Sequence, residues 1–328
     1  HLARIHLADS PPNVHLGGTC QLGDLDGNGR AEVLAAATLN RAGASLSKGP
    51  GIGGLPGGSA FIVWDESFPA ALWPEDYAFA LQEATGPVTT LDGRDVGRNF
   101  GEELLAGADW DGDGAPDLFV GDLAAESFTG VGWVFFDAAS LKGRLIELAQ
   151  LPPDIRLTRI VGPEFNAIGA DTAAWGDFDG DGWDDLLTGS PHALVEIDGT
   201  ERRGAGKVHI LFGQPAPWPQ EIDTSPAGLA QVEGLRITEI LGAAGQRPGD
   251  VGDTLCYSAA AGDVDGDGVV EALINEMVGN GPGPEDIDVG NLILLDWRTL
   301  AAPSRVLTPP GRPQRPLPPR LPRSSPPR

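Results

Sequence analysis

The residues that could do chemistry in this 328-residue chain are concentrated in one acidic nonapeptide, which occurs four times. Its pattern is Asp-x-Asp-Gly-(Asp/Asn)-Gly-x-x-(Asp/Glu), and the copies occupy residues 24–32, 109–117, 177–185 and 263–271. Side-chain oxygens stand at alternate positions, with glycines where the loop must bend sharply. Calcium accepts about six to eight such oxygens in flexible geometry. The pattern therefore predicts four calcium loops.

We expect each loop to bind one Ca²⁺ through the side chains at loop positions 1, 3, 5 and 9 and the backbone carbonyl at position 7. The first loop should bind most weakly, because Asn28 replaces an aspartate and Arg30 adds a positive charge. In chain order the residues at these positions are Asp24, Asp26, Asn28, Arg30, Glu32, Asp109, Asp111, Asp113, Ala115, Asp117, Asp177, Asp179, Asp181, Trp183, Asp185, Asp263, Asp265, Asp267, Val269 and Glu271.

An EF-hand is the obvious alternative for such a loop, but the spacing disfavours it. An EF-hand needs a bidentate glutamate at loop position 12 and a helix on each side. Position 12 is held here by residues without a carboxylate, namely Ala35, Val120, Thr188 and Ile274. Each loop is followed by a short apolar run that ends near turn residues, as at 117–121, and that length favours a strand.

Each loop lies inside a longer unit that must position it. An apolar residue followed by glycine precedes the loop, as at Phe100-Gly101, and the short apolar run follows it. After a loop of variable length come a second apolar run, as at 132–137, and a last one, as at 155–161. The order predicts an all-β chain of four units, each with four antiparallel strands.

On these motifs the chain resembles the FG-GAP repeat family, the calcium-binding β-propeller blades of integrin α subunits and of many bacterial surface proteins. The namesake Phe-Gly is literal only at Phe100-Gly101, and the Gly-Ala-Pro element is reduced to Gly189-Ser-Pro191. The resemblance covers approximately residues 1–300 and implies a β-propeller in which the calcium loop joins the first two strands of each blade. It does not imply integrin function, since the sequence has neither Asp-x-Ser-x-Ser nor Arg-Gly-Asp.

The resemblance leaves the size of the propeller open. We expect residues 1–307 to form the FG-GAP-type propeller and the Pro/Arg-rich residues 308–328 to be a disordered or extended tail. The four units either close into a four-bladed ring or belong to a larger, seven-bladed type of propeller. A strand predicted at 2–7 has no unit before it and the last unit has no clear fourth strand, which favours closure by the N-terminal strand.

Two cysteines bear on the same question. Cys20 and Cys256 lie just before the first and fourth loops, on the predicted innermost strands of units that would be neighbours in a closed four-bladed ring. A Cys20–Cys256 disulfide would then lock the ring by closing a very long loop in the unfolded chain. Two buried free thiols are the alternative.

The composition restricts the partners and the compartment. The formal net charge of −25 argues against nucleic acid and anionic membrane surfaces, both of which need basic contacts. No apolar run approaches the roughly 18 residues of a membrane span. The chain begins at His1, so we expect a processed or truncated product, and calcium loops of modest affinity fill only outside the cytosol. We expect a secreted or cell-surface protein, and nineteen arginines against three lysines favour a bacterial source.

The sequence carries no familiar catalytic motif. Its five histidines form no His-Glu-x-x-His pair, and neither Gly-x-Ser-x-Gly nor a phosphate loop occurs. We therefore expect a non-catalytic calcium-binding scaffold for protein interaction, adhesion or assembly, with a glycan-binding, lectin-like propeller as the alternative and an enzyme with a loop-built site as the third hypothesis. A protein partner should dock opposite the calcium loops, on the variable loops 38–58 and 276–289.

Overall fold

The structure, a computed structural model, describes residues 3–7, 15–38, 57–68, 77–94, 99–125, 129–162, 172–197, 200–243, 252–280 and 288–296. Within these residues the chain is all-β, as predicted, and the helices described over their full length are the single turn α2 (Pro226–Leu229) and four short 3-10 helices. No helix in the described part is long and apolar enough to cross a membrane.

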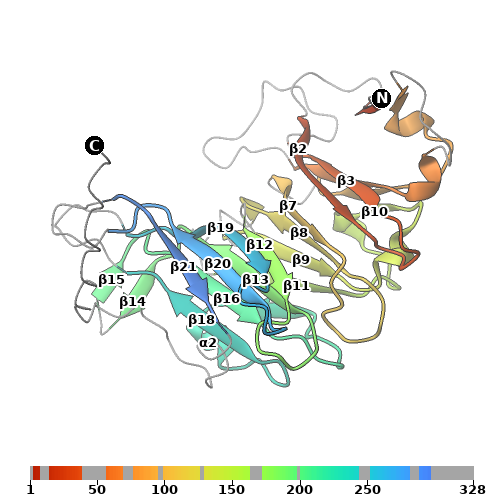
Figure 1. Cartoon of the computed structure of the whole chain (residues 1–328). Coiled ribbons are helices and arrows are strands. Elements are labelled where there is room, and N and C mark those ends of the chain that lie inside the picture. Colours follow the sequence, from red (N-terminus) through yellow and green to blue (C-terminus); the bar gives the residue numbers. More distant parts are fainter. Residues whose placement is uncertain are drawn as a thin grey trace, which may run out of the picture.

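Four sheets follow one another along the chain, and we number them sheets 1–4 (Figure 1). Sheet 1 contains β2 (Leu16–Gly23), β3 (Glu32–Ala37), β4 (Ser59–Val63) and β6 (Val88–Asp92). Sheet 2 contains β7 (Phe100–Ala106), β8 (Leu118–Asp122), β9 (Val131–Phe135) and β11 (Leu157–Val161). Sheet 3 contains β12 (Ala173–Gly176), β13 (Asp185–Ser190), β16 (Lys207–Leu211) and β18 (Ile237–Leu241). Sheet 4 contains β19 (Leu255–Gly262), β20 (Glu271–Glu276) and β21 (Asn291–Leu295).

Every consecutive pair of strands within a sheet is antiparallel. The predicted four-stranded unit is therefore confirmed for sheets 1–3. Sheet 4 has three strands among the described residues, which end at Asp296, so the expected lack of a fourth strand after it stays a prediction. The apolar-Gly pair has a structural role in sheet 2, where the β7–β8 register shifts between Phe100 and Leu104. Gly101 has φ 93°, and a Cβ on it would lie 2.5 Å from the Cβ of Ala36 in sheet 1, so only glycine fits there.

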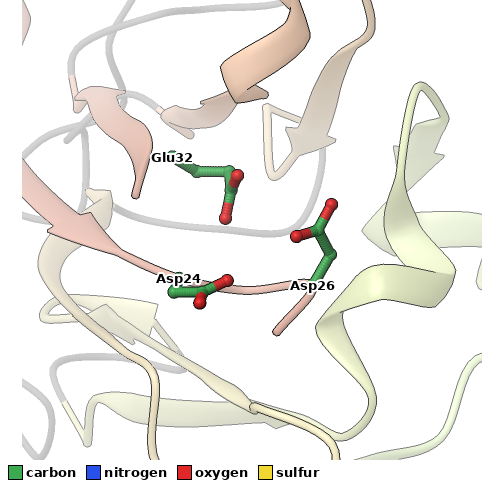
Figure 2. A group of neighbouring side chains, drawn as sticks. All are labelled: Asp24, Asp26 and Glu32. Carbon is green, nitrogen blue, oxygen red and sulfur yellow. The ribbon is translucent and has the colours of Figure 1, made fainter. Parts of the chain in front are cut away.

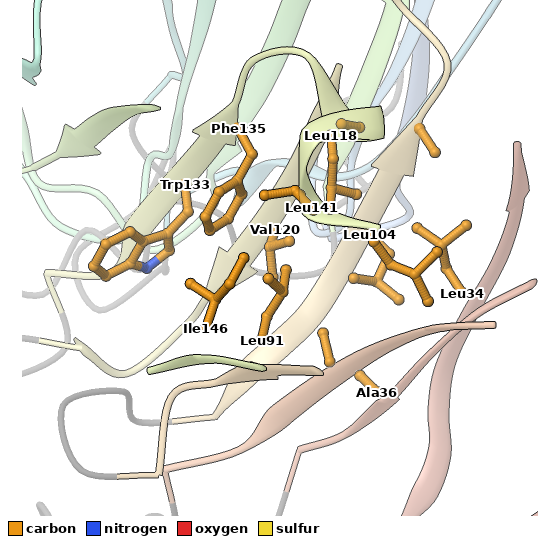
Figure 3. Packing of buried hydrophobic residues seen from close by; sticks show 14 of the residues in the cluster. Leu34, Ala36, Leu91, Leu104, Leu118, Val120, Trp133, Phe135, Leu141 and Ile146 are labelled. Atoms are coloured by element: carbon orange, nitrogen blue, oxygen red, sulfur yellow. The ribbon is translucent and has the colours of Figure 1, made fainter. Parts of the chain in front are cut away.

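The hydrophobic core consists of layers between consecutive sheets. Successive residues of a strand point to opposite faces, so Val120 packs toward sheet 1 while its neighbour Phe119 packs toward sheet 3. Figure 3 shows the first layer, in which Leu34 and Leu91 of sheet 1 meet Leu104 of sheet 2. The second layer includes Phe119, Val134, Leu186 and Leu211, and the third includes Val208, Ile210, Ala272 and Ile274.

Short parallel strands connect neighbouring sheets, and the sequence did not predict them. Each lies in the connection between the third and fourth strands of one sheet. β10 (Leu145–Glu147), from sheet 2, pairs with β6 of sheet 1, and β17 (Glu221–Asp223), from sheet 3, pairs with β11 of sheet 2. β5 (Tyr77–Ala80), from sheet 1, pairs in the same parallel manner with β1 (Ala3–His6). A separate hairpin of β14 (Val195–Ile197) and β15 (Thr200–Arg202) leaves sheet 3 between β13 and β16.

The expected pairing of the N-terminal strand with the last unit is not present among the described residues. β1 pairs with β5 of the first unit, and β21 has β20 as its only strand neighbour among the described residues. Sheet 1 and sheet 4 lie at opposite ends of the row of sheets (Figure 1). The described residues form no closed ring, and the number of blades stays a prediction.

The expected Cys20–Cys256 disulfide is not formed. Cys20 is exposed on β2 and Cys256 is buried on β19, and both are free thiols. The physical reason is that β2 and β19 belong to the first and last sheets, which would be neighbours only in a closed four-sheet ring. Most of the proposed docking loops 38–58 and 276–289, namely residues 39–56 and 281–287, and the tail at 308–328 lie outside the described residues, so the expectations for them stay predictions.

Candidate metal centres

The four acidic loops occupy the same place in the four sheets, between the first strand and the second. They connect β2 to β3, β7 to β8, β12 to β13 and β19 to β20, as the resemblance implied. The glycines at loop positions 4 and 6 all have positive φ, for example 66° at Gly112 and 87° at Gly114. Side chains with a Cβ are strained in that region, so these glycines let the backbone wind tightly around the acidic side chains.

Hydrogen bonds fix the carboxylates inside each loop, as the second loop illustrates. The carboxylate of Asp109 accepts from the backbone N–H of Asp113 at 3.1 Å and from that of Gly114 at 2.9 Å. Asp117, the closing acid, accepts from the backbone N–H of Trp110 at 2.9 Å. The other three loops repeat the bond to the closing acid, at 2.6, 2.8 and 2.8 Å. The first and last acids of the loop are thereby held in position before any ion binds.

The acids at loop positions 1, 3 and 9 come together in every loop. In each case the three residues offer carboxylate oxygens that lie within 4.8 Å of one another, and such a group could hold a metal ion. Figure 2 shows the group of the first loop, with three side chains around a common space. The four groups are Asp24, Asp26 and Glu32; Asp109, Asp111 and Asp117; Asp177, Asp179 and Asp185; and Asp263, Asp265 and Glu271.

The residues predicted at position 5 are not members of these groups. Their side-chain oxygens instead accept from the backbone N–H at position 7, as in the 2.8 Å bond from Arg30 to Asn28 and the 2.9 Å bond from Ala115 to Asp113. The third and fourth loops contain the same bond, from Trp183 and Val269. A ligand role for position 5 and for the carbonyl at position 7 therefore stays a prediction.

Burial raises the pKa of three closing acids, Glu32, Asp117 and Asp185. Desolvation raises the pKa of Asp117 to about 8 and that of Asp185 to about 8, although two backbone N–H groups donate to each of them. Desolvation likewise raises the pKa of Glu32, and the nearby carboxylates of Asp26 and Asp65 act in the same direction. Buried carboxylates beside other carboxylates are costly unless a cation neutralises them, so the loops favour a bound cation.

Basic side chains already partner the position 3 acids of three loops, and the sequence analysis missed them. The Lys142 ammonium lies 2.8 Å from Asp26, while the guanidinium of Arg156 pairs with Asp111 and that of Arg236 pairs with Asp179. Within the described residues no ion pair reaches Asp265, the corresponding acid of the fourth loop.

Two of these cations share a position that the sequence could have revealed. Arg156 and Arg236 each stand one residue before a fourth strand, in the matching sequences Arg-Leu-Thr and Arg-Ile-Thr. Sheet 1 has Pro87 at that place, and Lys142 from the sheet 2 connection supplies the charge instead. Arg30 of the first loop, predicted to weaken calcium binding, forms an ion pair with Asp65 at 2.9 Å. Part of its charge is therefore neutralised outside the loop.

The loops also contact their neighbours. The backbone N–H of Asp109 donates to Oδ2 of Asp184, next to the closing acid of the third loop, at 3.0 Å. The backbone N–H of Val270 donates to the carbonyl of Asp177 at 3.0 Å, which links the fourth loop to the third. The row of loops therefore runs across the boundaries between sheets 2, 3 and 4.

A family model agrees with this geometry. Residues 170–211 match the model of the FG-GAP repeat. The matched segment contains β12, the third acidic loop, β13 and β16, so the suspected resemblance is confirmed in the third unit. No curated protein matches the chain.

Proposed function

Because the chain carries an FG-GAP repeat, we propose that it is a non-catalytic, extracellular, calcium-binding protein of the integrin-α-like β-propeller type, acting as a scaffold for protein interaction, adhesion or assembly. The observation that carries the proposal is the group of three carboxylates that recurs at loop positions 1, 3 and 9 in four equivalent loops. One such group would be an ordinary acidic surface feature. Four such groups at the same place in four sheets indicate that the repeat has a metal-binding role.

The chemistry of the donors favours calcium over other metals. All side chains in the four groups are carboxylates, and hard oxygen donors suit Ca²⁺ and Mg²⁺ rather than zinc or copper. Mg²⁺ demands near-ideal octahedral geometry and keeps several waters, whereas Ca²⁺ accepts the irregular, crowded oxygen sets of such loops. The position 5 side chain and the position 7 carbonyl would complete the coordination. When bound, calcium would neutralise the acids and fix the turn between the first two strands.

Calcium would act on the assembly of the sheets as well as on each loop. The formal net charge is −25, and the loops concentrate acids at one end of every sheet. Hydrogen bonds such as that from Asp109 to Asp184 connect one loop to the next, so ordering one loop supports its neighbour. We therefore assign calcium a structural role, and place any protein partner on the opposite end of the sheets, where connections can vary without disturbing the metal.

An extracellular location follows from the same chemistry. FG-GAP repeats are typical of extracellular β-propellers of the integrin-α type, and calcium is abundant outside the cytosol. The strongly acidic surface disfavours nucleic acids and anionic membranes and favours a protein partner, which need not be basic if it binds away from the loops.

Isothermal titration calorimetry of chelator-treated protein tests the proposal. We expect four calcium sites in the unaltered chain and three in an Asp177→Ala/Asp179→Ala variant. Asp154→Ala removes an exposed acid that pairs with Arg144 away from the loops, and this matched control should keep four sites. Absence of calcium uptake by the unaltered chain would contradict the proposal, as would equal uptake by the loop variant.

A further inference from the structure

The strand β1 shares its parallel pairing and its sequence pattern with the fourth strands. In sheets 1 and 2 the fourth strand pairs in parallel with a short strand from the next sheet, through its third to fifth residues. The pairs are Thr90–Leu145, Leu91–Ile146 and Asp92–Glu147 in one case, and Arg159–Glu221, Ile160–Ile222 and Val161–Asp223 in the other. β1 pairs with β5 in the same parallel direction, through Ala3–Tyr77, Arg4–Ala78, Ile5–Phe79 and His6–Ala80.

The sequence of β1 supports the same assignment. Residues 2–6 read Leu-Ala-Arg-Ile-His, and the fourth strand β11 at 157–161 reads Leu-Thr-Arg-Ile-Val. Fourth strands β6 and β11 pair on their other edge with a third strand, β4 or β9. The corresponding edge of β1 has no strand partner within the described residues. β1 is therefore a fourth strand whose third strand is not supplied by the sheets described.

Sheet 4 lacks a fourth strand among the described residues. Its third strand β21 pairs with β20 on one edge, and its other edge has no strand beside it in the described part of the chain. Sheets 1, 2 and 3 place a fourth strand at that edge. In sheet 3 the third strand β16 pairs with the fourth strand β18. If β1 paired with β21 in the same register, Ile5 would lie opposite Leu292 and Arg4 opposite Ile293.

The outer face of sheet 4 is built to be covered by a further sheet. Leu292 and Leu294, the second and fourth residues of β21, are 74% and 51% exposed. The residues at the same places in the third strands of sheets 1 and 3 are at most 3% exposed, because the next sheet packs on them: Ala60, Ile62, Val208 and Ile210. An apolar strand face left exposed at the end of the row is a docking surface.

We propose that a second copy of this chain covers that surface, adding its β1 to the edge of β21 and its sheet 1 to the outer face of sheet 4. We call this contact the joint. The same chain carries both surfaces that form it: the edge and outer face of sheet 4, and the strand β1, which β5 holds to sheet 1. These surfaces lie at opposite ends of the row of sheets, so one chain presents them to another (Figure 1). The contact is head-to-tail, and such contacts close into rings when the rotation permits.

Two copies would meet at two identical joints. Each copy brings four sheets, and a closed pair has about eight, which is within the known range of β-propellers. The joint adds backbone hydrogen bonds along β21 and buries Leu292 and Leu294 as the equivalent residues are buried elsewhere. It also covers the edge of β21 that has no strand neighbour among the described residues, and such an edge is otherwise a site for unspecific strand pairing.

Cross-linking between two variants with one introduced cysteine each tests the joint, in the full chain with calcium present and with Cys20→Ser, so that the buried Cys256 is the one native thiol left. Ile5→Cys and Leu292→Cys are prepared separately with different tags and are then mixed under mild oxidation. Facing side chains of paired strands lie close enough for a disulfide. We expect a disulfide-linked heterodimer, and no covalent dimer from either variant alone. Absence of the heterodimer overturns the proposal.

Two further measurements distinguish a second copy from the two alternatives, which are the chain's own β1 and a different polypeptide. The unaltered chain should have twice the 34.1-kDa chain mass by sedimentation equilibrium, and Leu292→Arg should restore the mass of one chain. Leu194→Arg alters a residue that is 40% exposed in the connection from β13 to β14 of sheet 3, which is not one of the two end sheets, and should leave the mass doubled. If a chain carrying both new cysteines forms its disulfide internally, its own β1 closes the ring and the proposal is wrong. A single-chain mass at all concentrations also overturns it, and would indicate that another polypeptide completes sheet 4.

Discussion

The backbone N–H of Asp109 donates a 3.0 Å hydrogen bond to the carboxylate of Asp184, and this bond joins the second acidic loop to the third. Burial raises the pKa of Asp184, as the charges of Asp109 and Asp177 also do, so the carboxylate is held in an unfavourable electrostatic setting by its place between two loops. A cation in either loop would relieve that repulsion. The two metal centres are therefore expected to be coupled through this residue.

Substitution of Asp184 should weaken the coupling. Asp184→Ala leaves the Asp109 N–H without this acceptor, and we expect a loss of about 1–3 kcal/mol in the free energy of unfolding. Calcium affinities of the second and third loops should then become independent in calorimetric titrations. Asp184→Asn retains a side-chain oxygen and is the matched control, with a smaller loss expected. Equal stability of the alanine variant and the unaltered protein would contradict this role.

Calcium should stabilise the fold because it binds the folded chain alone. A ligand at 100 times its dissociation constant adds about 2.7 kcal/mol per site. We expect a chelator to lower the melting temperature markedly, as followed by circular dichroism, and equal ionic strength supplied by Mg²⁺ to restore it only in part. An unchanged melting temperature after removal of calcium at low salt would show that the loops fold without an ion.

The pH dependence of the metal-free protein follows from Asp117 and Asp185, whose pKa burial raises to about 8 in both cases. A raised pKa means that the folded state holds the proton more tightly than the unfolded state does. The resulting stability is complete below the ordinary pKa of about 4 and is lost as the pH rises through about 8. We therefore expect metal-free protein to become less stable to urea over this interval.

Calcium should reverse that trend, since it binds the deprotonated carboxylates. The stabilisation by calcium should thus be larger at about pH 8 than at about pH 5. Asp117→Asn and Asp185→Asn mimic the protonated acid and should each flatten the metal-free pH dependence. If both variants keep the slope of the unaltered protein, other groups control it.

Arg156 should compete with calcium in the second loop. Its guanidinium pairs with Asp111 and Asp113, two of the expected ligands. A unit charge about 4 Å away contributes on the order of 1 kcal/mol in water-like surroundings. We expect Arg156→Gln to raise calcium affinity at this loop several-fold and to lower the stability of the metal-free protein. Arg159→Gln, whose side chain pairs with Glu221, is the control and should leave the affinity unchanged. Weaker calcium binding in Arg156→Gln would contradict competition.

The sequence was sufficient to predict the loops and most strands, because both depend on local pattern. Glycine spacing determines the bends of a loop, and apolar runs such as 117–121 become strands when both faces are covered. The parallel strands were missed because they are too short to have a period: β10 contains three residues. Lys142 was missed because it lies 116 residues from its partner Asp26, and only the packing of sheet 2 on sheet 1 brings them together.

β1 shows the same limit, because its partner β5 was not predicted. Its apolar pattern correctly predicted a strand of the fourth-strand type, but pattern does not specify which edge a strand joins. β5 occupies one edge of β1, and its own strand, in the connection between β4 and β6, has no recognisable signal in the sequence. The disulfide prediction depended on a closed four-bladed ring, which the described residues do not form, and both cysteines are free.

Native mass spectrometry counts bound ions directly and therefore tests the central claim, that each of the four acidic loops holds one calcium ion. Chelator-treated protein is returned to calcium and sprayed from a volatile buffer, beside the Asp177→Ala/Asp179→Ala variant. The account predicts a dominant species with four calcium ions per chain, and three in the variant. A chain that carries no calcium, or a variant with the same count as the unaltered protein, would contradict it.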